Sequence, residues 1–416
     1  MLVEVPDRKL SPLLADRQLA ELRGLASAAG VEVAGSLTQR IVKQNPRYLV
    51  GSGKALELAA LVREKQADLV IFDEELTPAQ AKELHDLTGV RVLDRSELIL
   101  DIFATRARSR EARLQVELAQ LQYMLPRLRR MWQHLSRIRG GIGLRGPGET
   151  QLETDRRAIA KRIADLRARL EEVDRSRAVQ RSGRKGWFRV ALVGYTNVGK
   201  STLLNTIAGA DVKVADQLFA TLDPATRTAD LGEGRSALVT DTVGFVRKLP
   251  HHLVASFRST LAEARQADAV LHVIDASCSE WEERYRVVDE VLEAMGVARG
   301  GGRRLLVFNK VDRITHSEES VLRDRALELE LAPAVFVSSL TGEAVNGLRT
   351  ELLARSRTGH EIVDLRVPAS EGGEVAALYR EGEVLSRRDE AGWVKMRVRL
   401  PPRGLGRVRS RGLAVE

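Results

Sequence analysis

The segment Gly194-Tyr-Thr-Asn-Val-Gly-Lys-Ser201 constrains the fold of this chain more than any other feature. It follows an apolar run, Phe188 to Gly194, that is typical of a buried strand, and it precedes a stretch to about Ala208 that is typical of a helix. A glycine-rich loop between a strand and a helix directs backbone N–H groups and the positive end of the helix dipole at one point. The segment therefore predicts a phosphate-binding loop in an α/β domain with a mostly parallel sheet and flanking helices.

Individual residues of this loop have expected partners. Lys200 would bridge the β- and γ-phosphates of a nucleoside triphosphate, and the hydroxyl of Ser201 would bind Mg²⁺ directly. The loop alone does not distinguish ATP from GTP. The predicted nucleotide contacts here are Gly194, Tyr195, Thr196, Asn197, Val198, Gly199, Lys200, Ser201 and Thr202.

A second motif, Asn309-Lys-Val-Asp312, makes that distinction. Guanine presents N1–H and an exocyclic amine as adjacent donors, and one carboxylate, that of Asp312, can accept both. Adenine would leave the carboxylate unpaired, which is costly. The motif follows the strand-like run Leu305 to Phe308, and the segment after the run Ala334 to Val337 could offer a backbone N–H to the guanine oxygen. The predicted base contacts are Asn309, Lys310, Val311, Asp312, Ser338, Ser339 and Leu340.

Two further segments are expected at the metal and the γ-phosphate. Asp241 ends the run Ala237 to Thr240 and would hold Mg²⁺ through water, while the N–H of Gly244 would reach the γ-phosphate. The upstream segment supplies a threonine for the metal; Thr221 is the first candidate and Thr226 the second. The expected contacts are Phe219, Ala220, Thr221, Leu222, Asp223, Asp241, Thr242, Val243 and Gly244, and the catalytic set is Lys200, Thr221 and Gly244.

The 416 residues divide into four predicted parts. Residues 1–105 alternate between helix and strand patterns and predict a small α/β subdomain. Residues 106–180 contain two leucine-rich stretches with alternating four- and three-residue spacing, which predict an antiparallel helical hairpin with a glycine-rich tip at 140–148. Residues 187–356 form the nucleotide-binding domain, and residues 361–416 a small, partly β C-terminal domain with a basic tail.

The charge of the chain is unevenly distributed. Residues 106–185 contain 21 Lys and Arg against 9 Asp and Glu, whereas the whole chain has a formal net charge of +9. Such a local surplus suggests a polyanionic partner, although a charged helix is more often simply a solvated face, and both interpretations stay open here. The single cysteine, Cys278, fits a reducing cytoplasm. The N-terminus lacks a secretory signal pattern, and we expect neither a membrane span nor a stable oligomer.

The motifs in this order resemble the HflX family of translation-factor-related GTPases. The likeness is carried by Gln115-Val-Glu-Leu-Ala-Gln-Leu-Gln-Tyr123, by the tip 140–148 with the following Glu149-Thr-Gln-Leu-Glu153, and by the segments Gly194 to Thr202 and Phe219 to Pro224. The resemblance extends from about Asn45 to Leu340 and is weak after Glu361.

The resemblance implies a cytoplasmic, Mg²⁺-dependent GTPase that binds the large ribosomal subunit and acts in splitting or rescuing stalled or idle ribosomes. The tip of the hairpin would then lie near the peptidyl-transferase centre. Its glycines would let the backbone approach nucleotides, and its arginines would contact phosphates. The expected ribosomal RNA contacts are Arg137, Arg139, Gly140, Gly141, Gly143, Arg145, Gly146 and Gly148.

The sequence departs from related GTPases at two positions. Phe245 follows Gly244 where many GTPases have the glutamine that orients the attacking water, so we expect slow hydrolysis without an activating partner. Ser339 stands where alanine is usual, and a contact through backbone should tolerate it. Asn197 resembles the asparagine that helps to hold K⁺ in potassium-stimulated relatives, which makes K⁺ a second candidate cofactor beside Mg²⁺.

Other functions are also compatible with these sequence motifs. The chain could be an RNA remodelling protein that uses ATP as well as GTP, or an RNA-binding module whose nucleotide domain is mainly regulatory. Retention of Lys200, Ser201, Thr221, Asp241 and Asp312 argues against a decayed site. A tRNA-modification GTPase should carry a cofactor-binding domain or a terminal cysteine, and the sequence has neither.

Overall fold

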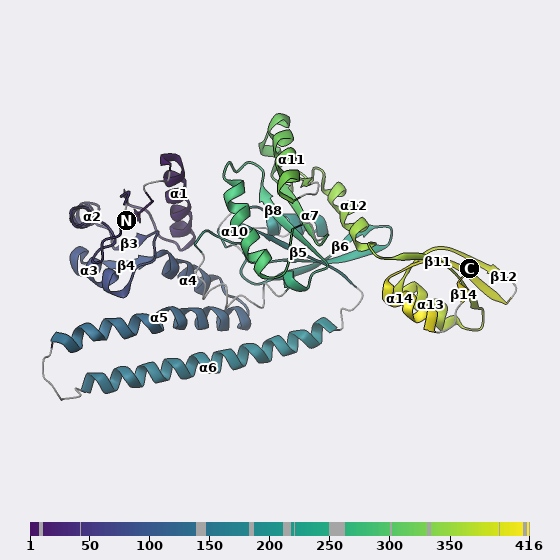
Figure 1. Cartoon of the computed structure of the whole chain (residues 1–416), viewed down its shortest axis with the longest axis horizontal. Coiled ribbons are helices and arrows are strands. Elements are labelled where there is room, and N and C mark those ends of the chain that lie inside the picture. Colours follow the sequence, from purple (N-terminus) through teal and green to yellow (C-terminus); the bar gives the residue numbers. More distant parts are fainter. Residues whose placement is uncertain are drawn as a thin grey trace.

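Three β-sheets and a long helical hairpin make up the described part of the chain (Figure 1). The computed structural model describes residues 1–7, 11–41, 43–138, 147–182, 187–210, 218–219, 221–248, 263–299, 302–330, 334–390, 392–410 and 414–415. The fold class predicted from the sequence is confirmed, because a mostly parallel sheet with flanking helices carries the phosphate-loop segment.

The N-terminal sheet is parallel throughout, with the order β2-β1-β3-β4. The helix α3 between its last two strands begins with a capping box, in which Thr77 and Gln80 satisfy each other's backbone N–H groups. The elements are β1 (Leu2–Glu4), α1 (Pro12–Ala28), β2 (Ser36–Thr38), α2 (Ser52–Glu64), β3 (Leu69–Phe72), α3 (Pro78–Thr88), β4 (Arg91–Asp94) and α4 (Arg95–Arg106).

The hairpin consists of α5 (Arg110–Ile138) and α6 (Pro147–Ser182), which lie side by side (Figure 1). Leu114 and Leu118 of α5 pack against Ile163 and Leu166 of α6, as the leucine spacing predicts. One expectation is corrected: Pro147 and Gly148, assigned to the tip, are the first residues of α6. Proline fits a first helical turn because its missing N–H has no partner there.

The central sheet has six strands in the order β10-β9-β8-β5-β7-β6, and all pairs except β6–β7 are parallel. Its helices include α7, which begins directly after the phosphate-loop segment. The elements are β5 (Phe188–Gly194), α7 (Lys200–Ala208), β6 (Ala225–Gly232), β7 (Arg235–Asp241), β8 (Ala269–Asp275), α10 (Trp281–Ala294), β9 (Arg304–Asn309), the 3₁₀ turn η1 (Val311–Arg313), α11 (His316–Glu330), β10 (Val335–Phe336) and α12 (Val345–Ser356).

The C-terminal part is a four-stranded antiparallel sheet with the order β12-β13-β11-β14, and two helices cover one face. Inward residues of β13 alternate with exposed ones, which explains the alternating pattern from Trp393 to Leu400. The elements are β11 (Glu361–Pro368), α13 (Gly372–Glu381), β12 (Glu383–Glu390), β13 (Trp393–Leu400), α14 (Pro402–Ser410) and β14 (Ala414–Val415).

The N-terminal part and the central sheet share one hydrophobic core. Leu22 and Leu25 of α1 and Phe103 of α4 belong to the same buried cluster as Tyr195 and Phe219 of the predicted nucleotide site. The elements before the central sheet therefore support the site directly. None of the described helices is both long enough and apolar enough to cross a membrane.

Candidate nucleotide-binding site

The phosphate-loop segment turns tightly between β5 and α7. Asn197 and Gly199 have φ angles of 61° and 90°, in the region that glycine adopts at no steric cost. Gly194 must stay small for a different reason, since a Cβ there would lie 2.3 Å from the carbonyl oxygen of Val273. Lys200 starts α7, is buried, and donates to the carbonyl oxygens of Gly194 and Tyr195 at 3.2 and 2.8 Å. The loop thus closes around the ammonium group that is expected to contact phosphate.

The surroundings of Lys200 destabilise the charged form of its side chain. Burial lowers the pKa of Lys200 to about 8, and the nearby Asp241 carboxylate offsets only part of that effect. A polyphosphate placed against the loop would stabilise the charged form and raise this pKa again. Proton uptake by Lys200 is therefore expected to accompany nucleotide binding.

Three oxygen-bearing side chains meet beside Lys200. The hydroxyl of Ser201 lies 2.7 Å from that of Thr221 and donates to Asp241 Oδ2 at 2.5 Å. The other oxygen of Asp241, Oδ1, is buried without a hydrogen-bond partner, and burial raises the pKa of this carboxyl. Two hydroxyls and a carboxylate with an unused buried oxygen fit Mg²⁺, a hard cation that takes few protein ligands and completes its shell with water and phosphate. The arrangement suits the predicted ligands Ser201, Thr221 and Asp241.

The base-recognition motif is braced against the phosphate-loop segment. The Asn309 amide donates to the carbonyl oxygen of Val198 at 2.8 Å, and its oxygen accepts the N–H of Ser339 at 2.9 Å. Lys310 donates to the carbonyl oxygen of Asn197 at 2.8 Å and to the carboxylate of Asp275 at 2.7 Å. Asp275, at the end of β8, was missed by sequence reasoning, although the end of a buried parallel strand is a place to look for such a residue.

The remaining residues predicted to contact the base lie beside this motif or near it. The hydroxyl of Ser338 donates to the carboxylate of Asp312 and so holds it in place. Val311 and Asp312 both belong to the short 3₁₀ turn η1, which follows Asn309 and Lys310. Leu340 is 76% exposed, so it can cover a ligand only from outside. The arrangement leaves Asp312 oriented by a neutral hydroxyl, which does not compete for its charge.

Phe245 takes a structural position. Its carbonyl oxygen accepts the N–H of Thr196 at 2.7 Å, and its own N–H donates to the carbonyl oxygen of Gly194 at 3.1 Å. The ring is buried in the core shared with the N-terminal part. Just before it, Val243 is buried and Thr242 donates to Leu192, so this segment is fixed to the end of β5. The side chain at position 245 is therefore a buried phenyl ring, which has no polar group with which to orient a water molecule.

Some predicted contacts lie elsewhere or outside the described residues. Asp223 accepts hydrogen bonds from the start of α5, and Thr226 bonds to Thr240 on the neighbouring strand at 2.9 Å. Of the two candidate threonines, it is the hydroxyl of Thr221 that lies beside that of Ser201. Phe219 and Leu222 are buried in the core. Outside the described residues lie Ala220, Arg139, Gly140, Gly141, Gly143, Arg145 and Gly146, while Arg137 and Gly148 are described only as helix backbone.

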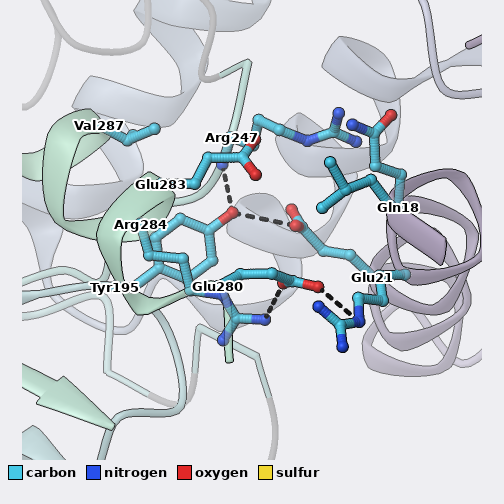
Figure 2. A pocket seen from close by; sticks show the side chains of 10 residues that line it. Gln18, Glu21, Tyr195, Arg247, Glu280, Glu283, Arg284 and Val287 are labelled. Carbon is cyan, nitrogen blue, oxygen red and sulfur yellow. Dashed lines mark hydrogen bonds and ion pairs between the residues drawn. The ribbon is translucent and has the colours of Figure 1, made fainter. Parts of the chain in front are cut away.

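A network of charged groups joins the site to the N-terminal part (Figure 2). The hydroxyl of Tyr195, in the phosphate-loop segment, donates to Glu21 at 3.0 Å and accepts the N–H of Arg247 at 2.6 Å. Figure 2 shows Glu21 of α1 and Arg284 of α10 beside Tyr195 and Arg247, which lie in loops of the nucleotide domain; all four residues line one opening. Sequence reasoning missed Glu21 and Arg247, because no motif links residues so far apart in the chain.

The carboxylate of Asp73 is surrounded by three cations. It pairs with Arg95 at 2.6 Å, with Arg247 at 3.1 Å and with Lys248 at 3.2 Å. Burial alone would raise the pKa of Asp73, but the three cations hold it below its ordinary value. Arg247 and Lys248 follow the Asp241–Gly244 motif directly, so this motif is tied to the N-terminal sheet.

Together, the phosphate-loop segment, the oxygen cluster and the braced Asn309–Asp312 motif define a P-loop guanine-nucleotide-binding domain. Family models match residues 16–104 (GTP-binding GTPase N-terminal), 106–184 (GTP-binding GTPase Middle Region) and 189–310 (50S ribosome-binding GTPase). The GTPase HflX of Magnetococcus marinus is 43% identical over 98% of this chain and 94% of its own length. That of Escherichia coli is 45% identical over 92% of this chain and 89% of its own length.

The chain therefore belongs to the HflX GTPase family and is a GTP-binding enzyme that hydrolyses GTP. Enzymes of this kind work with Mg²⁺. Among solved structures, a GTP-binding protein from the archaeon Sulfolobus solfataricus in complex with GDP is similar, at 24% identity and a TM-score of 0.44, over 86% of this chain and 99% of that one.

The lowered pKa of Lys200 predicts a pH dependence of GTP binding. As the pH rises above about 8, the free site loses a proton that the nucleotide-bound site retains, so affinity should fall by up to about tenfold per pH unit. Isothermal titration calorimetry in buffers of different ionisation enthalpy should also detect proton uptake. In Lys200→Arg the side chain stays charged over this pH range, so the remaining GTP affinity of the variant should not depend on pH. A wild-type affinity that is constant from pH 7 to pH 9.5 would contradict the role of Lys200.

The position of Asp312 predicts a change of base preference. Asp312→Asn should weaken GTP binding by roughly a hundredfold or more, because two charge-assisted hydrogen bonds to guanine are lost. The same variant should gain affinity for xanthosine triphosphate, whose C2 oxygen the new amide can donate to. Displacement of a fluorescent guanine nucleotide measures both effects. Asp324→Asn, on the exposed face of α11, is the control; equal GTP affinity of all three proteins would refute the assignment.

Proposed function

We propose that this GTPase binds the large ribosomal subunit, in its GTP-bound state, and acts in splitting or rescuing stalled or idle ribosomes. The observation that carries the proposal is the basic hairpin. Its second helix, α6, has 36 residues and so is about 54 Å long. Figure 1 shows α6 on the outer side of α5, away from the N-terminal and central sheets. A rod of this length can carry the glycine-rich tip into a narrow RNA cleft.

The described part of α6 exposes charged side chains of both signs, its basic residues among them. Arg156, Arg157, Lys161, Arg167 and Arg169 are exposed, while Leu166 between them is buried against α5. Cations held on a stiff helix favour a phosphate-rich surface, since each contact releases condensed counterions from RNA. One of the matching family models is described as a 50S ribosome-binding GTPase, which agrees with this partner. We propose that the protein works as a monomer in the cytoplasm, where ribosomes are.

The site supports a hydrolysis step that depends on the partner. Mg²⁺ held by Ser201, Thr221 and, through water, Asp241 would supply charge stabilisation at the β- and γ-phosphates, with Lys200 beside it. The backbone N–H of Gly244 would reach the γ-phosphate. Because Phe245 is buried and cannot orient water, a group from the ribosome or an ion must complete the site. This chain alone is therefore expected to hydrolyse GTP slowly.

Purified large subunits should increase GTP turnover at least tenfold. Arg145→Ala should weaken co-sedimentation with large subunits and reduce its salt dependence by about one phosphate contact. Nucleotide affinity of this variant should be unchanged, because residue 145 is not among the phosphate, metal or base residues of the site. Arg286→Ala, on exposed α10, is the matched control. Absence of stimulation by large subunits would overturn the ribosome-coupled mechanism.

One alternative function has a direct test. If the chain is an RNA remodelling protein that also uses ATP, then ATP and GTP should compete equally for a fluorescent guanine nucleotide. The hydroxyl-oriented carboxylate of Asp312 favours guanine instead.

Asn197 supports K⁺ as a further ion of the site. Its side chain is exposed at the mouth of the phosphate-loop segment, while its carbonyl oxygen is occupied by Lys310. K⁺ bound there would offset charge in the transition state as an arginine finger does. GTP turnover should then be several-fold faster in KCl than in NaCl, and Asn197→Ala should remove the difference. Equal wild-type turnover in both salts would exclude this role.

A further inference from the structure

The described residues of the stretch 218–224, here called the Thr221 segment, are held by elements that precede the nucleotide domain. A Cβ added to Gly24 of α1 would lie 3.1 Å from Leu218 Cδ1, so this leucine packs closely on α1. The ring of Phe219 meets that of Phe103 of α4 edge-on, with 4.6 Å between their centres. The beginning of the segment is therefore anchored on the N-terminal part.

The other end of the segment is anchored at the start of the hairpin. The carboxylate of Asp223 accepts the N–H of Arg108 at 3.1 Å, the N–H of Ser109 at 3.0 Å and the hydroxyl of Ser109. The same hydroxyl accepts the N–H of Ala112 at 3.0 Å, which makes Ser109 the N-cap of α5. A carboxylate at this helix end is stabilised by N–H donors and by the helix dipole.

Thr221 lies between the two anchors, and its hydroxyl is 2.7 Å from that of Ser201 at the proposed metal position. Two residues of chain span at most about 7 Å, so the carboxylate of Asp223 cannot move far without moving Thr221. Switch segments of this kind are ordered by γ-phosphate and its Mg²⁺ and released after hydrolysis. Movement of Thr221 away from the proposed metal position is therefore expected to break the bonds of Asp223 to the start of α5.

We propose that Asp223 and Ser109 form a clamp, in which Asp223 is a positioning residue for Thr221 and Ser109 is the attachment to the hairpin. The clamp closes when Mg²⁺ and γ-phosphate hold Thr221, and it opens with GDP. The hairpin thereby senses the nucleotide, and a partner that moves the hairpin changes the site by the same coupling free energy. The inference rests on the proposed role of Thr221 as a metal ligand, but it needs no ribosome.

Single-turnover GTP hydrolysis by the full chain, titrated with Mg²⁺, tests the clamp. Asp223→Ala and Ser109→Ala should each lower the rate roughly tenfold at limiting Mg²⁺, since charge-assisted hydrogen bonds are lost. GDP affinity should stay at the wild-type value because GDP does not engage Thr221. Ser109→Thr retains the hydroxyl and should restore the rate. Asp230→Ala is the matched control, because Asp230 is exposed and bonds only to the N–H of Gly232 within its own turn.

Hydrogen exchange at the amides of Arg108 and Ser109 gives a second readout that a purely structural cap would not produce. Exchange in the wild type should be several-fold slower with a non-hydrolysable GTP analogue than with GDP, and Asp223→Ala should abolish the difference. Identical exchange in both nucleotide states of the wild type would overturn the clamp.

The variant Thr221→Ala distinguishes a failure of the clamp from a failure of the assignment of Thr221 as a metal ligand. If it slows hydrolysis while Asp223→Ala and Ser109→Ala do not, the clamp is wrong and the site assignment stands. If Thr221→Ala itself has the wild-type rate and Mg²⁺ dependence, the assignment of Thr221 is wrong.

Discussion

The guanidinium of Arg95 is the interaction on which the arrangement of this molecule depends. It is 2% exposed and pairs with Asp73, which is 1% exposed, and with Glu21 of α1. A buried charge that loses its partner costs several kcal/mol, about 3–5 in measured cases. Asp73 also binds Arg247 and Lys248, just after the Asp241–Gly244 motif. Separation of the N-terminal part from the nucleotide domain would therefore leave several buried charged groups without their partners at once.

The two segments that we propose to contact the γ-phosphate are both held by elements outside the nucleotide domain. The segment after Gly244 is held by the Asp73 cluster, and the Thr221 segment by α1, α4 and the start of α5. Phe245 contributes backbone bonds and buried surface instead of chemistry. The site is thus built to bind and to switch, and the missing catalytic group fits a hydrolysis step that waits for a partner.

The sequence allowed the local motifs to be predicted, but not the contacts between parts. The strand from Phe188 to Gly194, the leucine seam of the hairpin and the meeting of Ser201, Thr221 and Asp241 all follow from short-range patterns. The contact of Asp223 with Ser109 joins residues 114 positions apart, and the contact of Tyr195 with Glu21 spans 174 positions. No periodicity or motif encodes such pairs, so the sequence indicated Asp223 only as a nucleotide contact and did not reveal its bonds to Ser109. The start of α6 is a local matter: the predicted tip extended to residue 148, whereas the helix begins at Pro147.

The central claim is that the nucleotide site and the hairpin that we propose to bind the ribosome share one coupling free energy. The affinity of the full chain for purified large ribosomal subunits, measured with a non-hydrolysable GTP analogue and with GDP, tests it most directly. The account predicts tighter binding with the analogue, and large subunits should raise the affinity for the analogue relative to GDP by the same factor. Equal affinity for large subunits in both nucleotide states would contradict it.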